Sequence, residues 1–240
     1  MYGLKILRFS TKYLTGLVLL FSLVNCANSA SSNKQTIEKA QQLLGKQEFT
    51  KALNLAMPLA QKGDAAAQAV VGSLYFYTDK NSHHDPKKGL YWLRKSANNG
   101  NAVGQFRLGM NLVDLKSTMN PGPKKEKLKK EAIKWFRASS AQGHAFAQME
   151  LGKIYMMGLL GVKRDRIKAI KWFKLASNRF NHVSGSRNTI AASSKGFADG
   201  FINNMVENKL VTQAQYKQAL SEAEQWEKSH QHVYKTWPFE

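Results

Sequence analysis

The stretch that decides the fold is GHAFAQMELGKIYMMGLLGVKRDRIKAIKWFKLAS, residues 143–177, because part of its pattern occurs three times in the chain. It starts with a glycine, and a glutamine follows after five residues, an aliphatic residue after eight and a second glycine after nine. The starting glycines of the three copies are separated by 37 and 43 residues. The three sets are Gly63, Gln68, Val71 and Gly72; Gly100, Gln105, Leu108 and Gly109; and Gly143, Gln148, Leu151 and Gly152. Agreement at several fixed offsets indicates an internal repeat.

The same frame extends backwards from each starting glycine, which we call the junction glycine. A tryptophan stands eight residues before the second and third junctions, at Trp92 and Trp135, and Trp172 continues the step. Small residues recur eleven residues before each junction and at the next step: Ala52, Gly89, Ala132 and Ala169. Small and aromatic residues at fixed offsets are typical of repeated units that stack in register.

Each unit is predicted to be a pair of helices. The segments Ala65–Tyr77 and Ala145–Met157 carry apolar residues at helical spacing. The second helix of the first unit is predicted to begin after Asp85, which can cap its N-terminus, with Pro86 in the first turn. The junction glycines suit the left-handed conformation that ends a helix. Turn-rich segments separate the two helices of each pair: Asp79–Pro86, Thr118–Pro123 and Gly158–Asp165.

A second glycine falls inside the first helix of each unit, at Gly72, Gly109 and Gly152. Glycine inside a helix costs about 1 kcal/mol relative to alanine. Its repeated use predicts that another helix approaches too closely for a side chain.

These residues resemble Sel-like repeats, which are relatives of the tetratricopeptide class. The junction Met57–Gln68 is similar to that family's junction, and the third unit matches its pattern closely at Leu151–Tyr155, Gly158, Gly161–Val162, Asp165, Lys168–Ala169 and Trp172–Phe173. The resemblance covers about residues 34–180. It implies a right-handed α/α solenoid that serves as an adaptor or scaffold, without a common catalytic site, and that in bacteria is often exported.

Two departures from the family pattern lead to expectations of their own. The middle unit is six residues longer, around Pro121–Pro123, and we expect the extra residues to loop out at an edge of the solenoid. Phe180 stands where a fourth junction glycine is expected, so the regular array should stop near Asn178.

The predicted fold is therefore all-α, a solenoid of helix pairs with helical caps. Asn33–Leu44 and Gln47–Lys62 are expected to form the first pair of helices, and Thr189–Val206 and Thr212–Lys228 the last. The domains are predicted as a signal peptide at 1–30, the repeat solenoid at 31–180, a helical cap at 181–229 and a loose tail at 230–240.

The signal peptide is predicted from a three-part pattern. A basic start (Lys5, Arg8 and Lys12) precedes the uncharged run Leu14–Val24, and small residues before Ala30 suit cleavage. We expect a periplasmic or secreted protein. The alternative is a lipoprotein anchored through Cys26, although Asn25 departs from the usual residue before a lipidated cysteine. As Cys26 is the only cysteine, an intramolecular disulfide is excluded.

The net charge of +20, from 36 Lys and Arg against 16 Asp and Glu, predicts attraction to anionic surfaces. Two basic clusters one unit apart could form a ridge, or else be ordinary solvated helix faces. If the chain is exported, anionic lipid or acidic glycan of the envelope or host is more accessible to it than nucleic acid, for which it has no recognised module. The candidate ridge residues are Lys124, Lys127, Lys130, Lys134, Arg137, Lys163, Arg164, Lys168 and Lys171.

A protein or peptide partner could instead bind along the concave face. Positions six, ten and thirteen after each junction lie on one face of the first helix, and methionine and phenylalanine there would suit an adaptable groove. Packing between units is the alternative that apolar stripes usually favour. The candidate groove residues are Phe76, Phe106, Met110, Met149, Lys153 and Met156.

Signals for enzymatic chemistry are absent from the sequence. No phosphate-binding glycine loop, zinc-ligand pair or nucleophile elbow occurs. His83 and His84 fall in a predicted loop, while His144 occupies the slot of Asp64 and Asn101 and should start a helix. We therefore predict a monomeric, non-enzymatic scaffold without cofactor or metal, which binds a protein partner, or alternatively an anionic surface.

Overall fold

The computed structural model describes residues 31–76, 83–117, 120–183 and 189–234, and the predicted signal peptide with Cys26 lies outside these ranges. Within them every regular element is a helix, which confirms the predicted all-α class. Residues 31–45 are helical. The other helices are α2 (Phe49–Gln61), α3 (Ala65–Phe76), α4 (Pro86–Asn98), α5 (Ala102–Ser117), α6 (Pro123–Ala141), α7 (Ala145–Met157), α8 (Arg166–Val183), α9 (Thr189–Glu207), α10 (Gln213–Ser229) and α11 (Gln231–Tyr234).

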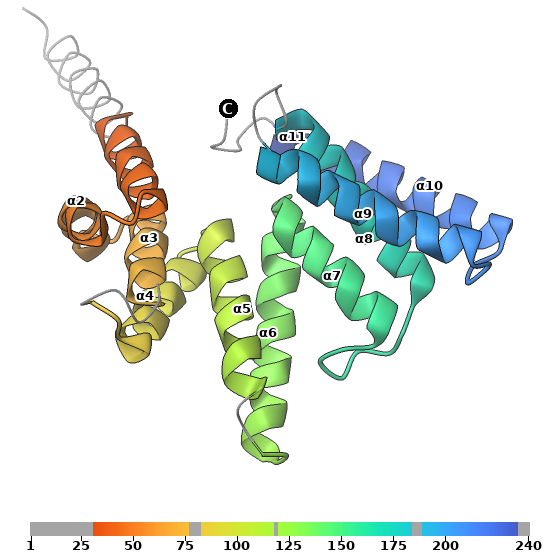
Figure 1. The fold of residues 1–240 in the computed structure, drawn as a ribbon, viewed down its shortest axis with the longest axis horizontal. Coiled ribbons are helices and arrows are strands. Elements are labelled where there is room, and N and C mark those ends of the chain that lie inside the picture. Colours follow the sequence, from red (N-terminus) through yellow and green to blue (C-terminus); the bar gives the residue numbers. More distant parts are fainter. Residues whose placement is uncertain (1–30, 77–82, 118–119, 184–188, 235–240) are drawn as a thin grey trace, which may run out of the picture.

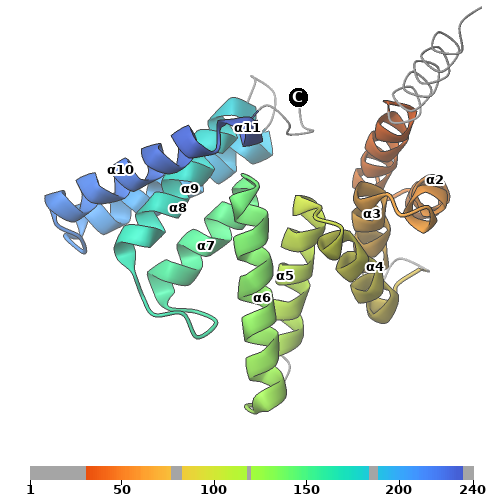
Figure 2. The same ribbon diagram turned by 180° about the vertical axis from the view of Figure 1, so that it is seen from behind.

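Consecutive helices pack side by side in a curved row (Figure 1). The helices of each unit form a tight pair: α3 with α4, α5 with α6 and α7 with α8. Contacts of α4 with α5 and of α6 with α7 join the pairs, and the two views agree on this order (Figure 2). This is the arrangement of a solenoid, in which each unit buries its apolar face against its neighbours.

The junctions between units have the predicted geometry. Gly63, Gly100 and Gly143 adopt φ of +98°, +81° and +73°, a left-handed conformation that glycine adopts without strain. The residue after each glycine then caps the next helix. Side-chain atoms of Asp64, Asn101 and His144 accept hydrogen bonds from the backbone N–H three residues on, at 2.9, 2.8 and 3.2 Å. The prediction that His144 starts a helix is thus confirmed.

The glycines inside the first helices allow the predicted close approach. A Cβ atom added to Gly72 would lie 2.7 Å from the side chain of Leu93. At Gly109 the added atom would lie 2.9 Å from the ring of Phe136 in α6. At Gly152 it would lie 2.6 Å from the ring of Phe173 in α8. The glycines therefore let the two helices of a pair approach more closely than any side chain would permit.

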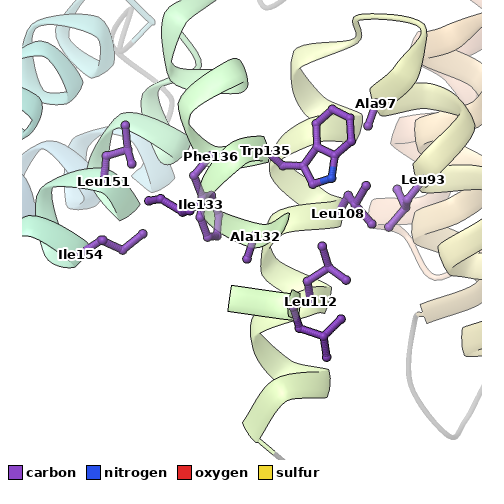
Figure 3. Packing of buried hydrophobic residues seen from close by; sticks show 11 residues of the cluster. Leu93, Ala97, Leu108, Leu112, Ala132, Ile133, Trp135, Phe136, Leu151 and Ile154 are labelled. Atoms are coloured by element: carbon purple, nitrogen blue, oxygen red, sulfur yellow. The ribbon is translucent and has the colours of Figure 1, made fainter. Parts of the chain in front are cut away.

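The largest of several apolar clusters runs from α4 to α7 (Figure 3). Leu93 of α4, Leu108 and Leu112 of α5, Phe136 of α6 and Leu151 of α7 are all buried in it. Because the core crosses the boundaries between units, each unit depends on its neighbours for burial.

The six extra residues of the middle unit lengthen a helix and do not loop out, so that expectation was wrong. The helix α6 has 19 residues where α4 has 13. Pro123 stands in its first turn, and the following residues are mostly lysine, glutamate, leucine and alanine. These residues favour helix strongly enough for the insertion to extend the pair.

The array ends because a glycine is missing. With Phe180 in place of the fourth junction glycine, α8 continues to Val183, and the phenylalanine ring is buried against Phe146 at 5.0 Å between centroids. The helices α9 and α10 then cover α8. Beyond α10, His230 stacks on Trp226 at 4.1 Å, and α11 occupies the first part of the tail that was expected to be loose. Residues 235–240 lie outside the described ranges.

Candidate binding sites

A basic pocket of about 800 Å³ opens where α6, the loop after α7, the start of α8 and the turn before α10 meet. We call it the basic pocket. Its cationic side chains come from two elements that the sequence separates by more than twenty residues. They are Lys130 and Arg137 of α6, and Lys163, Arg164, Arg166 and Lys168 of the loop and α8.

The loop after α7 is held by short-range turns. Gly158 ends α7 in a left-handed conformation, and Leu160 and Gly161 also have positive φ. The backbone N–H of Asp165 then donates to the carbonyl oxygen of Tyr155 at 2.9 Å. These contacts fold the loop back toward α7 and hold its basic residues at the edge of the pocket.

Among the described residues that line the basic pocket, Asp165 is the one carboxylate. Its Oδ1 accepts from the backbone N–H of Lys168 at 2.9 Å, and its Oδ2 lies 2.9 Å from the ammonium of the same lysine. Partial burial raises the pKa of Asp165, but the hydrogen bonds and charge of Lys168 outweigh it and lower the pKa overall. This carboxylate therefore stays ionised and already has partners.

The remaining cations of the pocket are scarcely neutralised by the protein. Arg137 reaches the hydroxyl of Tyr155 at 3.4 Å. In the described part of the chain no carboxylate lies within 4.0 Å of Lys130, Lys163, Arg164 or Arg166. The pocket can thus attract and bind an anion without first breaking an ion pair.

The predicted ridge is only partly gathered at this pocket. Lys124, Lys127 and Lys134 are exposed elsewhere on α6. Lys171 also lies outside the pocket, where it pairs with Glu222 at 3.9 Å and lies over the ring of Trp172. Apart from Asp165, the lining side chains that sequence reasoning missed are apolar or neutral, and no charge or motif marked them in the sequence. They are Ile133, Tyr155, Leu160, Ile167, Leu210, Val211 and Gln215.

A second hollow, of about 380 Å³, lies between the helical residues 31–45, α3 and α5. We call it the N-terminal groove. Its walls are largely apolar, with Ile37, Ala69 and Val103 among the side chains that line it, and Lys34 and Arg107 also border it. Ala69 occupies the sixth position after its junction, but none of the six candidate groove residues lines this hollow.

The other predicted groove residues mainly contact neighbouring helices. Phe106 stacks on His144 at 4.7 Å between ring centroids. Met149 and Met156 pack against a cluster that includes residues of α8 and α9. Phe76 faces Gly89, Met110 packs on the central core and Lys153 pairs with Glu150 at 2.7 Å. All six candidate groove residues are half-buried.

Two of the histidines contact groups elsewhere in the fold. His144 is buried, and burial together with the charge of Arg107 lowers its pKa to about 3. The Nε2 of His83 lies 3.0 Å from the hydroxyl of Thr50. Within the described ranges no group of three or more His, Cys, Asp or Glu side chains could hold a metal ion. None of the described helices combines the length and the apolar composition that a membrane span requires.

Comparison with known proteins identifies the repeat. A family model described as Sel1 repeat matches residues 65–101, 102–144 and 145–179. A solved structure of a protective antigen of uropathogenic Escherichia coli strains, which displays an SLR fold, is 29% identical with a TM-score of 0.56. The match covers 78% of this chain and 35% of the antigen, so the chain spans about a third of that protein.

A Sel1 repeat protein from Oxalobacter formigenes is 25% identical with a TM-score of 0.45, over 53% of this chain and 90% of that protein. No curated protein matches the chain.

Proposed function

Residues 65–179 consist of three Sel1 repeats, and we propose that the protein is an exported, non-enzymatic scaffold that binds a protein partner. Proteins built from Sel1 repeats generally mediate protein–protein interaction and are generally not enzymes. Export rests on the basic start, apolar run and small residues of the first 30 positions.

The observation that carries the proposal is the N-terminal groove. It lies on the first helices of two successive units, and its mixture of apolar walls and charged rim suits a helix or extended segment of another protein.

The test places a photo-crosslinking amino acid at Val103 in the groove or, as a control, at Tyr91, which is 53% exposed and lies outside the groove. The full-length sequence is expressed in its host, crosslinked in cells, and the adducts are identified by mass spectrometry. We expect one protein to be enriched at Val103 and absent at Tyr91, and to be lost when Ala69 is replaced by glutamate in a chain that still folds. Equal adducts at both positions would contradict the proposal.

A second candidate function is docking on an anionic lipid or acidic glycan. The observation that favours it is the exposed basic residues of α6, which continue from the basic pocket along the helix. Replacing Lys127, Lys130, Arg164 and Lys168 by glutamate should then abolish binding to phosphatidylglycerol vesicles or to heparin. Unchanged binding would rule this function out.

A further inference from the structure

The loop that borders the basic pocket is built on a framework that the repeat already provides. In the third unit the backbone N–H of Asp165 donates to the carbonyl of Tyr155 at 2.9 Å, and in the first unit Asp85 donates to Tyr75 at the same distance. In both units a lysine three residues after the aspartate lies over the tyrosine ring, at 5.7 Å from its centroid. These shared contacts fix the end of the loop and the start of α8 in the same way as the start of α4.

The strongly basic residues of the loop are additions to that framework. In the first unit no lysine or arginine stands at the positions equivalent to Lys163, Arg164 and Arg166. These positions carry His83, His84 and Pro86. The first unit folds its helix pair without these cations. They concentrate charge at one place without a structural requirement, which points to binding.

The charge of the pocket does not distinguish one class of anionic ligand from another, but the apolar side chains of its walls do. Ile133, Leu160, Ile167 and Leu210 line the same hollow as the cations, and Leu210 is 41% exposed. A sulfated or uronic glycan presents polar groups on nearly every edge and would leave these side chains uncovered. The sugar-stacking alternative is also disfavoured, because the ring of Tyr155 is already occupied by Lys168.

We propose that the basic pocket binds a short acidic segment of a protein partner, in which one or more apolar side chains stand between carboxylates. The carboxylates would pair with Lys130, Lys163 and Arg164, and the apolar side chain would cover Leu210. This inference rests on the proposed scaffold function and names the chemistry of the partner at one site. Since no carboxylate of the described residues pairs with Lys130, Lys163 or Arg164, their binding to the segment gains ion pairs without losing any that the structure shows.

The test uses protein expressed from the full-length sequence and two fluorescent probes in anisotropy titrations. One probe is a twelve-residue peptide of Glu, Asp and Leu, and the other has the same length and charge because serine replaces each of its leucines. We expect the leucine-containing peptide to bind at least tenfold more tightly, with an affinity that falls as salt is raised.

Matched variants separate a specific pocket from general charge attraction. The double variant Lys163→Gln, Arg164→Gln should bind the leucine-containing peptide at least tenfold more weakly. The pair Lys124→Gln and Lys127→Gln removes the same charge from exposed positions outside the pocket and should change binding less than twofold. Leu210→Ser should weaken the binding of the leucine-containing peptide and leave the binding of the other peptide unchanged. Circular dichroism melts of each variant check that the chain still folds.

Several outcomes would overturn the inference. Equal loss in the two charge pairs would show general attraction, and tighter binding of heparin or phosphatidylglycerol vesicles that depends on Lys163 and Arg164 would assign the pocket to another ligand. Absence of peptide binding would refute it as well. A partner that crosslinks at Val103 and is unaffected by the pocket variants would leave the scaffold function standing while the pocket inference fails.

Discussion

The side-chain amide of Gln142 donates a hydrogen bond to Oε1 of Gln105 across 2.8 Å, linking the end of one helix pair to the first helix of its own unit. In the preceding unit Asn99 donates to Gln68 in the same way at 3.0 Å. Each repeat glutamine also donates its own amide to a carbonyl at the end of the preceding pair, Gln105 to Ala97 at 3.2 Å. Gln68 and Gln105, the glutamines at offset five in the first two units, thus each tie three successive helices together in the buried interior.

Replacing Gln105 by leucine should destabilise the fold by about 2–3 kcal/mol. The substitution keeps the volume but removes two hydrogen bonds, one to the carbonyl of Ala97 and one from the half-buried amide of Gln142, and each bond contributes about 1–1.5 kcal/mol. Urea denaturation followed by circular dichroism measures the change. Gln218→Leu is the control, because Gln218 is exposed on α10, and its effect should stay within about 0.5 kcal/mol. Equal effects would show that the buried bonds are unimportant.

Two glycines inside helices should respond to alanine in opposite directions. At Gly152 the new Cβ would lie 2.6 Å from the ring of Phe173, so Gly152→Ala should destabilise by about 1–3 kcal/mol despite its higher helix propensity. At Gly196 of α9 nothing lies within 4 Å, so Gly196→Ala should stabilise by about 0.5–1 kcal/mol. Thermal unfolding of the two variants gives the signs. A stabilised Gly152→Ala protein would contradict the close approach of α7 and α8.

Burial of His144 should make stability depend on pH between about 7 and 5. Its pKa is about 3 in the folded protein and near 6.5 when unfolded, so the unfolded chain binds the proton first as pH falls. The stabilising contribution is complete above pH 6.5 and decreases toward pH 3, by about 2 kcal/mol at pH 5. Protonation also opposes capping, because Nδ1 accepts from the N–H of Ala147.

The comparison variant is His144→Asn, which takes the residue found at the same slot in the middle unit, Asn101. Asparagine can cap the helix but does not titrate. Denaturant unfolding at pH 7, 6 and 5 should show a smaller loss of stability in the variant. Parallel pH dependences would mean that His144 is not responsible.

The sequence predicted the repeated parts of the fold because local offsets determine them. Junction glycines, capping residues and internal glycines each act within one unit or on its neighbour, so their spacing alone identifies the helix pairs. The expectation of a loop at Pro121–Pro123 was wrong, because the lysine-rich segment after Pro123 has a helix propensity that outweighs the turn signal. Propensity was the better guide there.

The sites were predicted less completely, for a physical reason. The charges of the basic pocket were visible as two clusters, but their meeting depends on how α6 lies against the loop after α7. Leu210, which lines the pocket from the turn before α10, carries no sequence signal that relates it to Lys130. Contacts between distant segments follow from the tertiary arrangement and cannot be counted as offsets.

Export gives the last prediction, and the mature N-terminus tests it. The run Leu14–Val24 has 11 uncharged residues, which suits a signal peptide and is short for a membrane span. Intact-mass measurement of the protein from its host should show a chain that begins at Ala30, outside the cytoplasm. In the lipoprotein alternative the mature chain begins at a lipidated Cys26, and Cys26→Ser would abolish the lipid and the membrane association. An unprocessed cytoplasmic chain would contradict both, and would make nucleic acid available to the basic residues of α6.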